Sequence, residues 1–341
     1  MPPAAPPSYS TVSGGFIADW LSALEPLCSA AQFRSLLERS DLSADQDLHS
    51  RVTLDQIVEL YRLAAVETGD EMMGLWSRPI RPRALQHLLT SVREATTLPS
   101  ALYRFSTFWN LLLDDYQFSL TETGTTLTLQ LNPQTEQSPQ RFGHMLILKL
   151  AHGLTSWLAR HEVPVREVAF AFSPPAFAED YAVIFPAPVR FERDASAISF
   201  DPNNLRPVQP RGAADLDLFL TNAPRDWIFT KSQDHTQSLR VRGHLSRIGW
   251  EKADLNGTAQ ALNVTPRTLI RRLEADGTSF QAIKDALRRD IAIRHLQVGR
   301  LTTEAVAHEV GFSSAANFHR AFRRWTGSTP GAYRRHTSAR A

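Results

Sequence analysis

Two groups of arginines near the C-terminus have the spacing of side chains that share one face of a helix. Arg267 and Arg271 are four residues apart, and Arg320, Arg323 and Arg324 follow within another short stretch. A guanidinium group donates hydrogen bonds in a fixed fork that matches guanine, phosphate and carboxylate acceptors. The chemistry open to these residues is therefore the binding of an anionic or acceptor-rich partner.

Large apolar side chains beside the second group predict which face of its helix is buried. Phe318, Phe322 and Trp325 are spaced at i, i+4 and i+7, so they form one stripe along a helix. Arg320 lies about 200° around the helix from Phe318, so it points away from that stripe. The aromatic side chains are therefore expected in a core, and the arginines on a surface that can meet DNA. A purely solvated role for the arginines is the alternative.

Two segments of the C-terminal third form a quasi-repeat, TAQALNVTPRTLIRRL (258–273) and VAHEVGFSSAANFHRAF (306–322). Each predicts a short helix with a small residue, a turn and a second helix, which are the parts of a helix-turn-helix. The turns contain Asn263 and Gly311, residue types that tolerate positive φ. The second helices follow residues that cap helix N-termini: Thr265 before Pro266 in the first copy, and Ser313 or Ser314 in the second.

The segment between the two copies, SFQAIKDALRRDIAIRHLQVG (279–299), has the apolar spacing of one helix that ends at Gly299. A rigid helix here would fix the separation of the two second helices. Two helices that enter successive major-groove segments must lie about 34 Å apart. The segment is therefore predicted to be a connecting helix, and a plain core role is compatible with the same pattern.

Charge is distributed unevenly along the chain. The net charge is +2, but residues 233–341 hold 18 Lys and Arg against 9 Asp and Glu, which gives +9. The remainder holds 19 against 26, which gives −7. A basic C-terminal segment behind an acidic body indicates a nucleic-acid-binding domain joined to a second domain. Charge alone leaves a solvated basic face as the alternative.

The residues before the basic segment combine helical and strand patterns. The predicted elements are helices at 52–69 and 83–95, a β-hairpin at 116–131 around Gly124, a long apolar helix at about 139–161, a strand at 165–172 and two short strands within 186–200. After about residue 238 the pattern is helical throughout. The fold class is therefore an α+β domain followed by an all-α domain of two helix-turn-helix units joined by a connecting helix.

The long apolar helix carries a polar stripe of Lys149, His152, Ser156 and Arg160. One interpretation is that the stripe is the solvent-facing side of the helix. The other is that Lys149, His152 and Ser156 line an effector pocket, where an ammonium and an imidazole among apolar walls suit a small carboxylate or an acyl chain with an anionic head. In such a pocket Lys149 would pair with the carboxylate and His152 would hydrogen-bond to it.

Composition excludes several classes of protein. Cys28 is the single cysteine, which excludes a disulfide framework and a multi-cysteine zinc site, and its apolar context places it in a core. No nucleotide-binding or hydrolase motif occurs, and the eleven histidines show no metal-ligand spacing, so no enzyme activity, metal or cofactor is predicted. The N-terminus lacks a secretory pattern and the most apolar stretch is too short to cross a bilayer, so a cytoplasmic, membrane-independent protein is expected.

The segment from about Ser238 to Arg335 resembles the DNA-binding domain of AraC/XylS-type regulators. The resemblance lies in LNVTPRTLIRRL, GTSFQAIKDALRRDIAIRHL and VAHEVGFSSAANFHRAFRRWTGSTPGAYRR, and in the spacing between them. It implies two helix-turn-helix units in adjacent major-groove segments of duplex DNA, and RNA polymerase as a partner. The DNA contacts that it implies are Arg267, Ile270 and Arg271 in the first unit and Ala316, Asn317 and Arg320 in the second. Helical geometry places Arg323 and Arg324 beside the outer face, where they are expected to contact phosphates. Ala315 and Ala316 are smaller than the polar residues common at these positions, which reduces the base contacts expected of the second helix.

The N-terminal part, from 172 to 210, resembles the effector domain of AraC-type regulators related to the ornithine-utilisation and mycobacterial virulence regulators. The resemblance rests on the spacing P-V-x-F…S-F-D-x-x-x-L-x-x-P. It implies a transcription regulator, here expected to be an activator and a homodimer, that responds to a small-molecule effector. One alternative is an N-terminal domain that only dimerises or binds a protein partner. A further alternative is an enzyme domain fused to a DNA-binding module.

The expected domain boundaries follow from these patterns. They are a disordered N-terminus at 1–14, an effector-sensing or dimerisation domain at 15–230, a polar linker at 231–238 and a DNA-binding domain at 239–341, with helix-turn-helix units at about 254–276 and 302–326.

Overall fold

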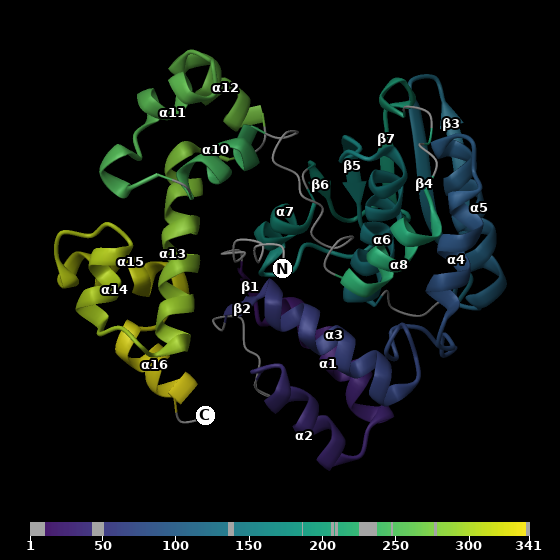
Figure 1. Cartoon of the computed structure of the whole chain (residues 1–341), viewed down its shortest axis with the longest axis horizontal. Helices are drawn as coiled ribbons and strands as arrows, with labels where there is room; N and C mark the ends of the chain where they lie inside the picture. Colours follow the sequence, from purple (N-terminus) through teal and green to yellow (C-terminus); the bar gives the residue numbers. More distant parts are fainter. Residues whose placement is uncertain are drawn as a thin grey trace. The chain divides into compact units, whose positions relative to one another are not determined.

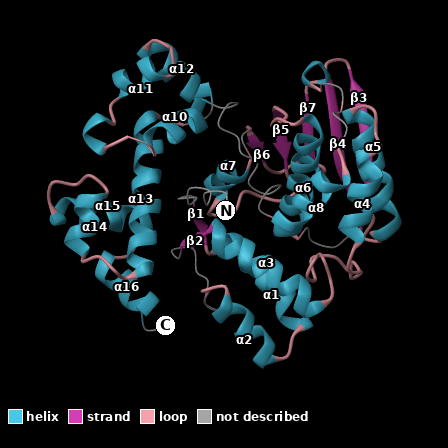
Figure 2. Ribbon diagram, in the orientation of Figure 1, coloured by secondary structure: helices cyan, strands magenta, loops and turns pink. Residues whose placement is uncertain are grey.

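The chain divides into two compact units in the computed structural model (Figure 1). The structure describes residues 11–42, 51–135, 140–185, 187–205, 208, 211–224, 237–246, 248–275 and 278–338. The α/β unit takes the described residues of 15–46 and 56–232, and the helical unit takes those of 1–14, 47–55 and 233–341. Figure 2 shows that the long strands belong to the α/β unit. The predicted fold class, α+β followed by an all-α helix-turn-helix domain, is confirmed.

The α/β unit contains a five-stranded sheet in the order β3-β4-β7-β5-β6. The neighbours pair antiparallel except β5 and β6, which are parallel. The predicted hairpin is present, and Gly124 occupies its turn with φ of 57°. The two strands expected within 186–200 also form, but β5 lies between them. The strand bounds are β3 Tyr116–Thr123, β4 Thr126–Pro133, β5 Val165–Ala169, β6 Val189–Arg190 and β7 Ser196–Phe200.

Helices make up the rest of the α/β unit, and α6 is its most buried element. All but two of the nineteen residues of α6 are buried, which explains why its sequence is apolar around most of its circumference. The helices are α1 Gly15–Leu24, η1 Glu25–Leu27, α2 Ala30–Arg39, α3 Leu54–Thr68, α4 Ala84–Arg93, α5 Leu98–Leu112, α6 Arg141–Ala159, η2 Ala178–Asp180, α7 Tyr181–Ile184, η3 Pro202–Asn204 and α8 Ala213–Asn222.

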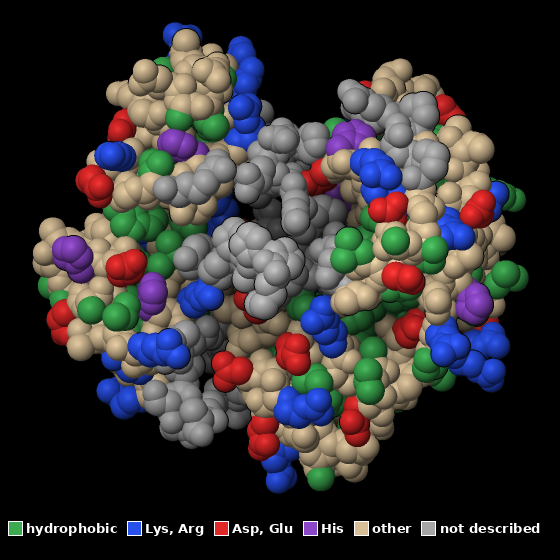
Figure 3. All heavy atoms as spheres, in the orientation of Figure 1, with side chains coloured by type: hydrophobic (Ala, Val, Ile, Leu, Met, Phe, Trp, Pro, Cys, Tyr) green, Lys and Arg blue, Asp and Glu red, His purple; other side chains and the backbone are tan. Residues whose placement is uncertain are grey.

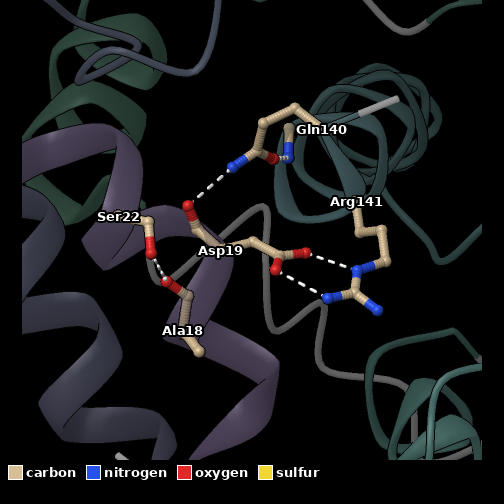
Figure 4. A network of polar contacts seen from close by, with 6 residues as sticks. Ala18, Asp19, Ser22, Gln140 and Arg141 are labelled. Carbon is tan, nitrogen blue, oxygen red and sulfur yellow. Dashed lines mark hydrogen bonds and ion pairs between the residues drawn. The ribbon is translucent and has the colours of Figure 1, made fainter. Parts of the chain in front are cut away.

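The N-terminus of α6 is attached to α1 by a polar network (Figure 4). Arg141 donates two hydrogen bonds to the carboxylate of Asp19, from Nε at 2.5 Å and from a terminal nitrogen at 2.7 Å. Gln140 donates to the carbonyl oxygen of Asp19 at 3.0 Å, and its own amide oxygen caps α6 by accepting from the Gly143 N–H. A bidentate guanidinium–carboxylate pair of this kind fixes both distance and orientation, so the network sets the crossing of α1 and α6.

The helical unit is arranged along α13, which runs through it with α10 to α12 at one end and α14 to α16 at the other (Figure 1). A predicted C-cap glycine, Gly299, ends α13 with φ of 70°. The bounds are α10 Gln237–Leu245, η4 Trp250–Lys252, α11 Leu255–Ala261, α12 Pro266–Ala275, α13 Phe280–Val298, α14 Thr303–Glu309, α15 Ala315–Thr326 and α16 Pro330–Ser338.

Two short strands from the N-terminal part of the chain belong to the helical unit. Strand β1, Thr11–Ser13, pairs antiparallel with β2, Arg51–Thr53. The Thr11 hydroxyl donates to the buried carboxylate of Asp290 on α13 at 2.6 Å, and Arg242 of α10 donates to the same carboxylate at 2.6 Å. Disorder predicted for 1–14 is therefore wrong for residues 11–13, and residues 1–10 lie outside the described residues.

The linker predicted at 231–238 overlaps the beginning of α10 in the structure. Residues 237 and 238 are the first two of α10, and the others lie outside the described residues. Within the first helix-turn-helix, expected at about 254–276, the structure has α11 and α12. Within the second, expected at about 302–326, it has α14 and α15.

Candidate nucleic-acid interface

Each helix-turn-helix has the turn that its sequence predicts. Asn263 has φ of 55° and Gly311 has φ of 77°, both in the left-handed region. The Thr265 hydroxyl accepts from the Thr268 N–H at 3.2 Å and so caps α12. In the second copy Ser314 is the cap, because its hydroxyl accepts from the Asn317 N–H at 3.3 Å. The two units therefore share a positive-φ turn residue and a hydroxyl N-cap on the second helix.

Helix α12 separates its apolar and basic faces. Leu269 and Leu273 are buried in the core of the first unit, while Arg267 and Arg271 are exposed. Ile270, the residue before Arg271, is 42% exposed. Arg267 and Arg271 form no ion pair with any of the described residues. Figure 3 shows Lys and Arg side chains lined up at the end of the helical unit where α12 lies.

Helix α15 shows the same separation. Phe318 and Phe322 are fully buried and Trp325 packs against their cluster, which confirms the predicted stripe. Ala316, Asn317 and Arg320 are exposed on the other side. A terminal guanidinium nitrogen of Arg320 donates to the Asn317 side-chain oxygen at 2.6 Å. This bond orients both side chains on the outer face of the helix.

The two arginines at the end of α15 have different surroundings. Arg323 is exposed and has no ion pair among the residues that the structure describes. Arg324 pairs with Asp285 of α13 at 3.3 Å, with 71% of its side chain exposed. Asp285 is 39 residues away in the sequence, so local spacing could not reveal this pair. Arg324 thus links the second unit to the connecting helix as well as facing solvent.

The predicted effector residues lie together in the interior of the α/β unit. Lys149, His152 and Ser156 are 1%, 0% and 6% exposed, so the solvent-facing interpretation of the stripe is wrong for these three. The ammonium of Lys149 lies 3.1 Å from His152 Nδ1, and since an ammonium can only donate, Nδ1 is the acceptor. His152 Nε2–H then donates to the Val163 carbonyl at 2.9 Å, and Ser156 accepts from the Val163 N–H at 3.1 Å.

A carboxylate of the chain itself completes this cluster. Glu162 is 8% exposed, and its Oε1 lies 3.9 Å from His152 Nε2. Burial lowers the pKa of Lys149 to about 8, and the nearby charge of Glu162 acts in the opposite direction. The Lys149 ammonium also lies 5.6 Å from the centre of the Phe185 ring. Glu162 lies beyond the end of α6, so the spacing along the helix gave no signal for it.

His144 and Cys28 are two further side chains that could titrate or react, and the structure gives each of them a structural environment. His144 Nδ1 lies 2.8 Å from the Ser196 hydroxyl, and burial lowers the pKa of His144 to about 3, so the imidazole is neutral. Cys28 is half-buried at the end of η1 rather than in the core that the sequence predicted. Burial and then the charge of Glu67 raise the pKa of its thiol, which is opposite to the shift that a reactive thiolate requires.

Two helix-turn-helix units on one connecting helix, each with an exposed basic face, define a DNA-binding domain. Residues 258–336 match a helix-turn-helix domain family. Residues 31–207, more than half of the chain, match the N-terminal arabinose-binding domain of AraC transcription regulators. The chain belongs to the AraC family of transcription regulators.

Relatives of the chain are similar over part of their length. The ornithine utilization regulator of Pseudomonas aeruginosa is 32% identical over 168 residues, 49% of this chain and 49% of that protein. The chain therefore spans about half the length of that relative. The transcriptional regulator VirS of Mycobacterium tuberculosis is 35% identical over 102 residues, 30% of each chain. The solved structure of the regulator CdpR from Pseudomonas aeruginosa has 20% identity and a TM-score of 0.32, covering 94% of this chain and 97% of that one.

These relatives are transcription regulators, and both family models that match the chain describe domains found in such regulators. Among the described residues, none of the helices has the length and apolar character needed to span a bilayer. The described residues also contain no group of three His, Cys, Asp or Glu side chains that could hold a metal ion.

Proposed function

We propose that the chain binds specific duplex DNA with α12 and α15 in two consecutive major-groove segments, and that an effector bound by the α/β unit controls this binding. One observation carries the proposal: both second helices bury an apolar face in their own core and expose arginine on the opposite face. An α-helix fits the major groove, and an exposed guanidinium can pair with guanine O6 and N7.

The exposed residues differ in the contacts that their chemistry supports. On α12, Arg267 and Arg271 present donors one helical turn apart beside Ile270, whose side chain suits the methyl group of thymine. On α15, Arg320 and Asn317 act as one joined group that can donate to a purine edge. We assign Arg323 and Arg324 to phosphates, and Ala316 to close approach of the helix to the groove.

The effector is proposed to be a small carboxylate or an acyl chain with an anionic head. Lys149, His152 and Ser156 support this proposal because they converge in a buried, largely apolar interior with one ammonium group. Glu162 already supplies a carboxylate near that ammonium, so an anionic effector would compete with it. The competing function, an α/β unit that only dimerises or binds a protein partner, would need no ligand at this cluster.

The remaining partners follow from regulation of transcription. We propose that the protein acts as an activator in the cytoplasm, where its DNA lies, and contacts RNA polymerase at the promoter. We also propose that it forms a homodimer, because two linked copies occupy paired sites more tightly through effective concentration.

Arg271→Ala tests the base contacts of the first unit. On a duplex obtained by in vitro selection with the full-length protein, the variant should bind about 1–3 kcal/mol more weakly and accept other bases at one position. Arg323→Ala is the matched control: loss of a phosphate contact should weaken binding on all duplexes alike and lower the salt dependence. Fluorescence anisotropy at several salt concentrations measures both effects. Unchanged affinity and base preference in Arg271→Ala would show that this face of α12 does not read DNA.

A further inference from the structure

The two helix-turn-helix units have separate hydrophobic cores. The first core surrounds Leu269 and Leu273 with Leu287 of α13, and the second surrounds Phe318 and Phe322 with other residues of α13. The two cores meet at α13, where partly buried Ile291 packs against both. If α13 were the sole connection, the orientation of α12 relative to α15 would depend on the stiffness of one helix. A contact made outside that helix would therefore add to the definition of this orientation.

Trp250 makes such a contact. It lies in η4, just before the first helix-turn-helix, and its Nε1–H donates to the carbonyl oxygen of Glu309 at the end of α14, at 2.8 Å. The indole also lies directly against the turn of the second unit. A Cβ added to Gly311 would come within 2.5 Å of Trp250 Cβ, so glycine is required there for space as well as for its positive φ.

Arg288 of α13 joins the same two units from the side of the connecting helix. Its guanidinium carbon lies 5.0 Å from the centre of the Trp250 ring and 4.9 Å from that of Phe312. Both distances are those of cation–π contacts. A terminal nitrogen of Arg288 also donates to the Gly311 carbonyl at 3.1 Å. One side chain thus contacts residues just before the first helix-turn-helix and the turn of the second.

We propose that Arg288, Trp250, Gly311 and Phe312 form a clamp that fixes the orientation of α12 relative to α15 and so determines the spacing between DNA segments that the protein accepts. The proposal rests on the proposed function, in which both helices enter DNA. One inserted base pair moves the second segment by about 3.4 Å and turns it by about 35°. A rigid pair of units then loses contacts at one segment, whereas a loosely joined pair adjusts.

Binding to duplexes of altered spacing tests the clamp. Fluorescence anisotropy at one salt concentration measures the affinity of the full-length protein for three duplexes. One is the selected duplex, and the other two have one base pair added or removed between the segments assigned to α12 and α15. Wild type should bind the altered duplexes about tenfold more weakly, because it loses a charge-assisted base contact at one of the two segments. In Arg288→Met the ratio of the affinity for the selected duplex to that for an altered duplex should fall to about two- to threefold. Trp250→Phe keeps an aromatic ring beside Arg288 but lacks the N–H donor, and its ratio should be intermediate.

Lys252→Met is the matched control, since it removes an exposed positive charge from the same short helix as Trp250. Its affinity should change equally on all three duplexes or not at all. The clamp is refuted if folded Arg288→Met and Trp250→Phe keep the wild-type ratio, or if they weaken binding equally at every spacing. Failure to select any preferred duplex with the wild-type protein would instead overturn the proposed function itself. Circular dichroism confirms folding, and Trp250→Phe, the milder change, serves if Arg288→Met does not fold.

Discussion

Replacement of Phe318 by alanine is expected to destabilise the second helix-turn-helix by about 3–5 kcal/mol, because it empties a fully buried position on α15. The Phe318 ring lies 5.7 Å from that of Phe312 and 5.5 Å from that of Phe322, so its loss removes one aromatic contact from each of these two rings. A loss of this size is comparable with the whole stability of many domains. Urea unfolding followed by circular dichroism, together with DNA binding, measures the effect.

Two further variants separate loss of the core from a general effect of truncation. Phe318→Leu keeps much of the buried volume and should cost less than Phe318→Ala. Leu111→Ala removes a side chain that is 74% exposed on α5 and should change stability by less than about 0.5 kcal/mol. Phe318→Ala protein that unfolds like wild type and binds DNA normally would contradict the buried stripe of α15.

Lys149→Met is expected to abolish the response to effector and leave DNA binding intact. The substitution keeps the side-chain length and removes the buried ammonium that we assign to an anionic effector. In a thermal-shift screen with small carboxylates and medium-chain fatty acids, a compound at about 100 times its Kd should stabilise wild type by about 2.7 kcal/mol. The same compound should give no stabilisation of Lys149→Met, and a reporter gene should no longer be induced.

Glu162 provides the control for this prediction. Lys149→Met leaves a carboxylate in the interior without the nearby ammonium, which by itself destabilises the fold. The double variant Lys149→Met with Glu162→Gln removes both charges and should fold, yet still not respond. Glu162→Gln alone removes the internal competitor and should bind the carboxylate more tightly than wild type. A Lys149→Met protein stabilised as strongly as wild type by the same compound would limit the cluster to a structural role.

The helical unit was predictable because its signals are local. Apolar spacing gave α12 and α15, while Asn263, Gly311 and Gly299 marked chain reversals that need positive φ. Each of these features depends on residues within about two helical turns. The outward direction of Arg271 and Arg320 follows from the same spacing, so the candidate DNA-binding faces could be predicted as well.

Contacts between distant residues were not predictable in this way. Periodicity identifies strands but not their order, so the position of β5 between β6 and β7 had no signal in the sequence. The polar stripe of α6 resembled the solvent-facing side of a helix. Nothing in its local sequence indicated that Val163 and Glu162 would interact with its buried side chains. Arg288 likewise has no local feature that distinguishes it from other helical arginines, because Trp250 and Phe312, which it contacts, are distant in the sequence.

Methylation interference on the selected duplex tests most directly whether one chain reads two consecutive segments with its two second helices. For each bound chain, guanine N7 methylation should block wild-type binding in two segments whose centres lie about one helical turn apart on one face of the DNA. In Arg271→Ala the interference should disappear from one segment, and in Arg320→Ala from the other. A single interfering segment for one chain, or loss of the same guanines in both variants, would contradict the two-helix account.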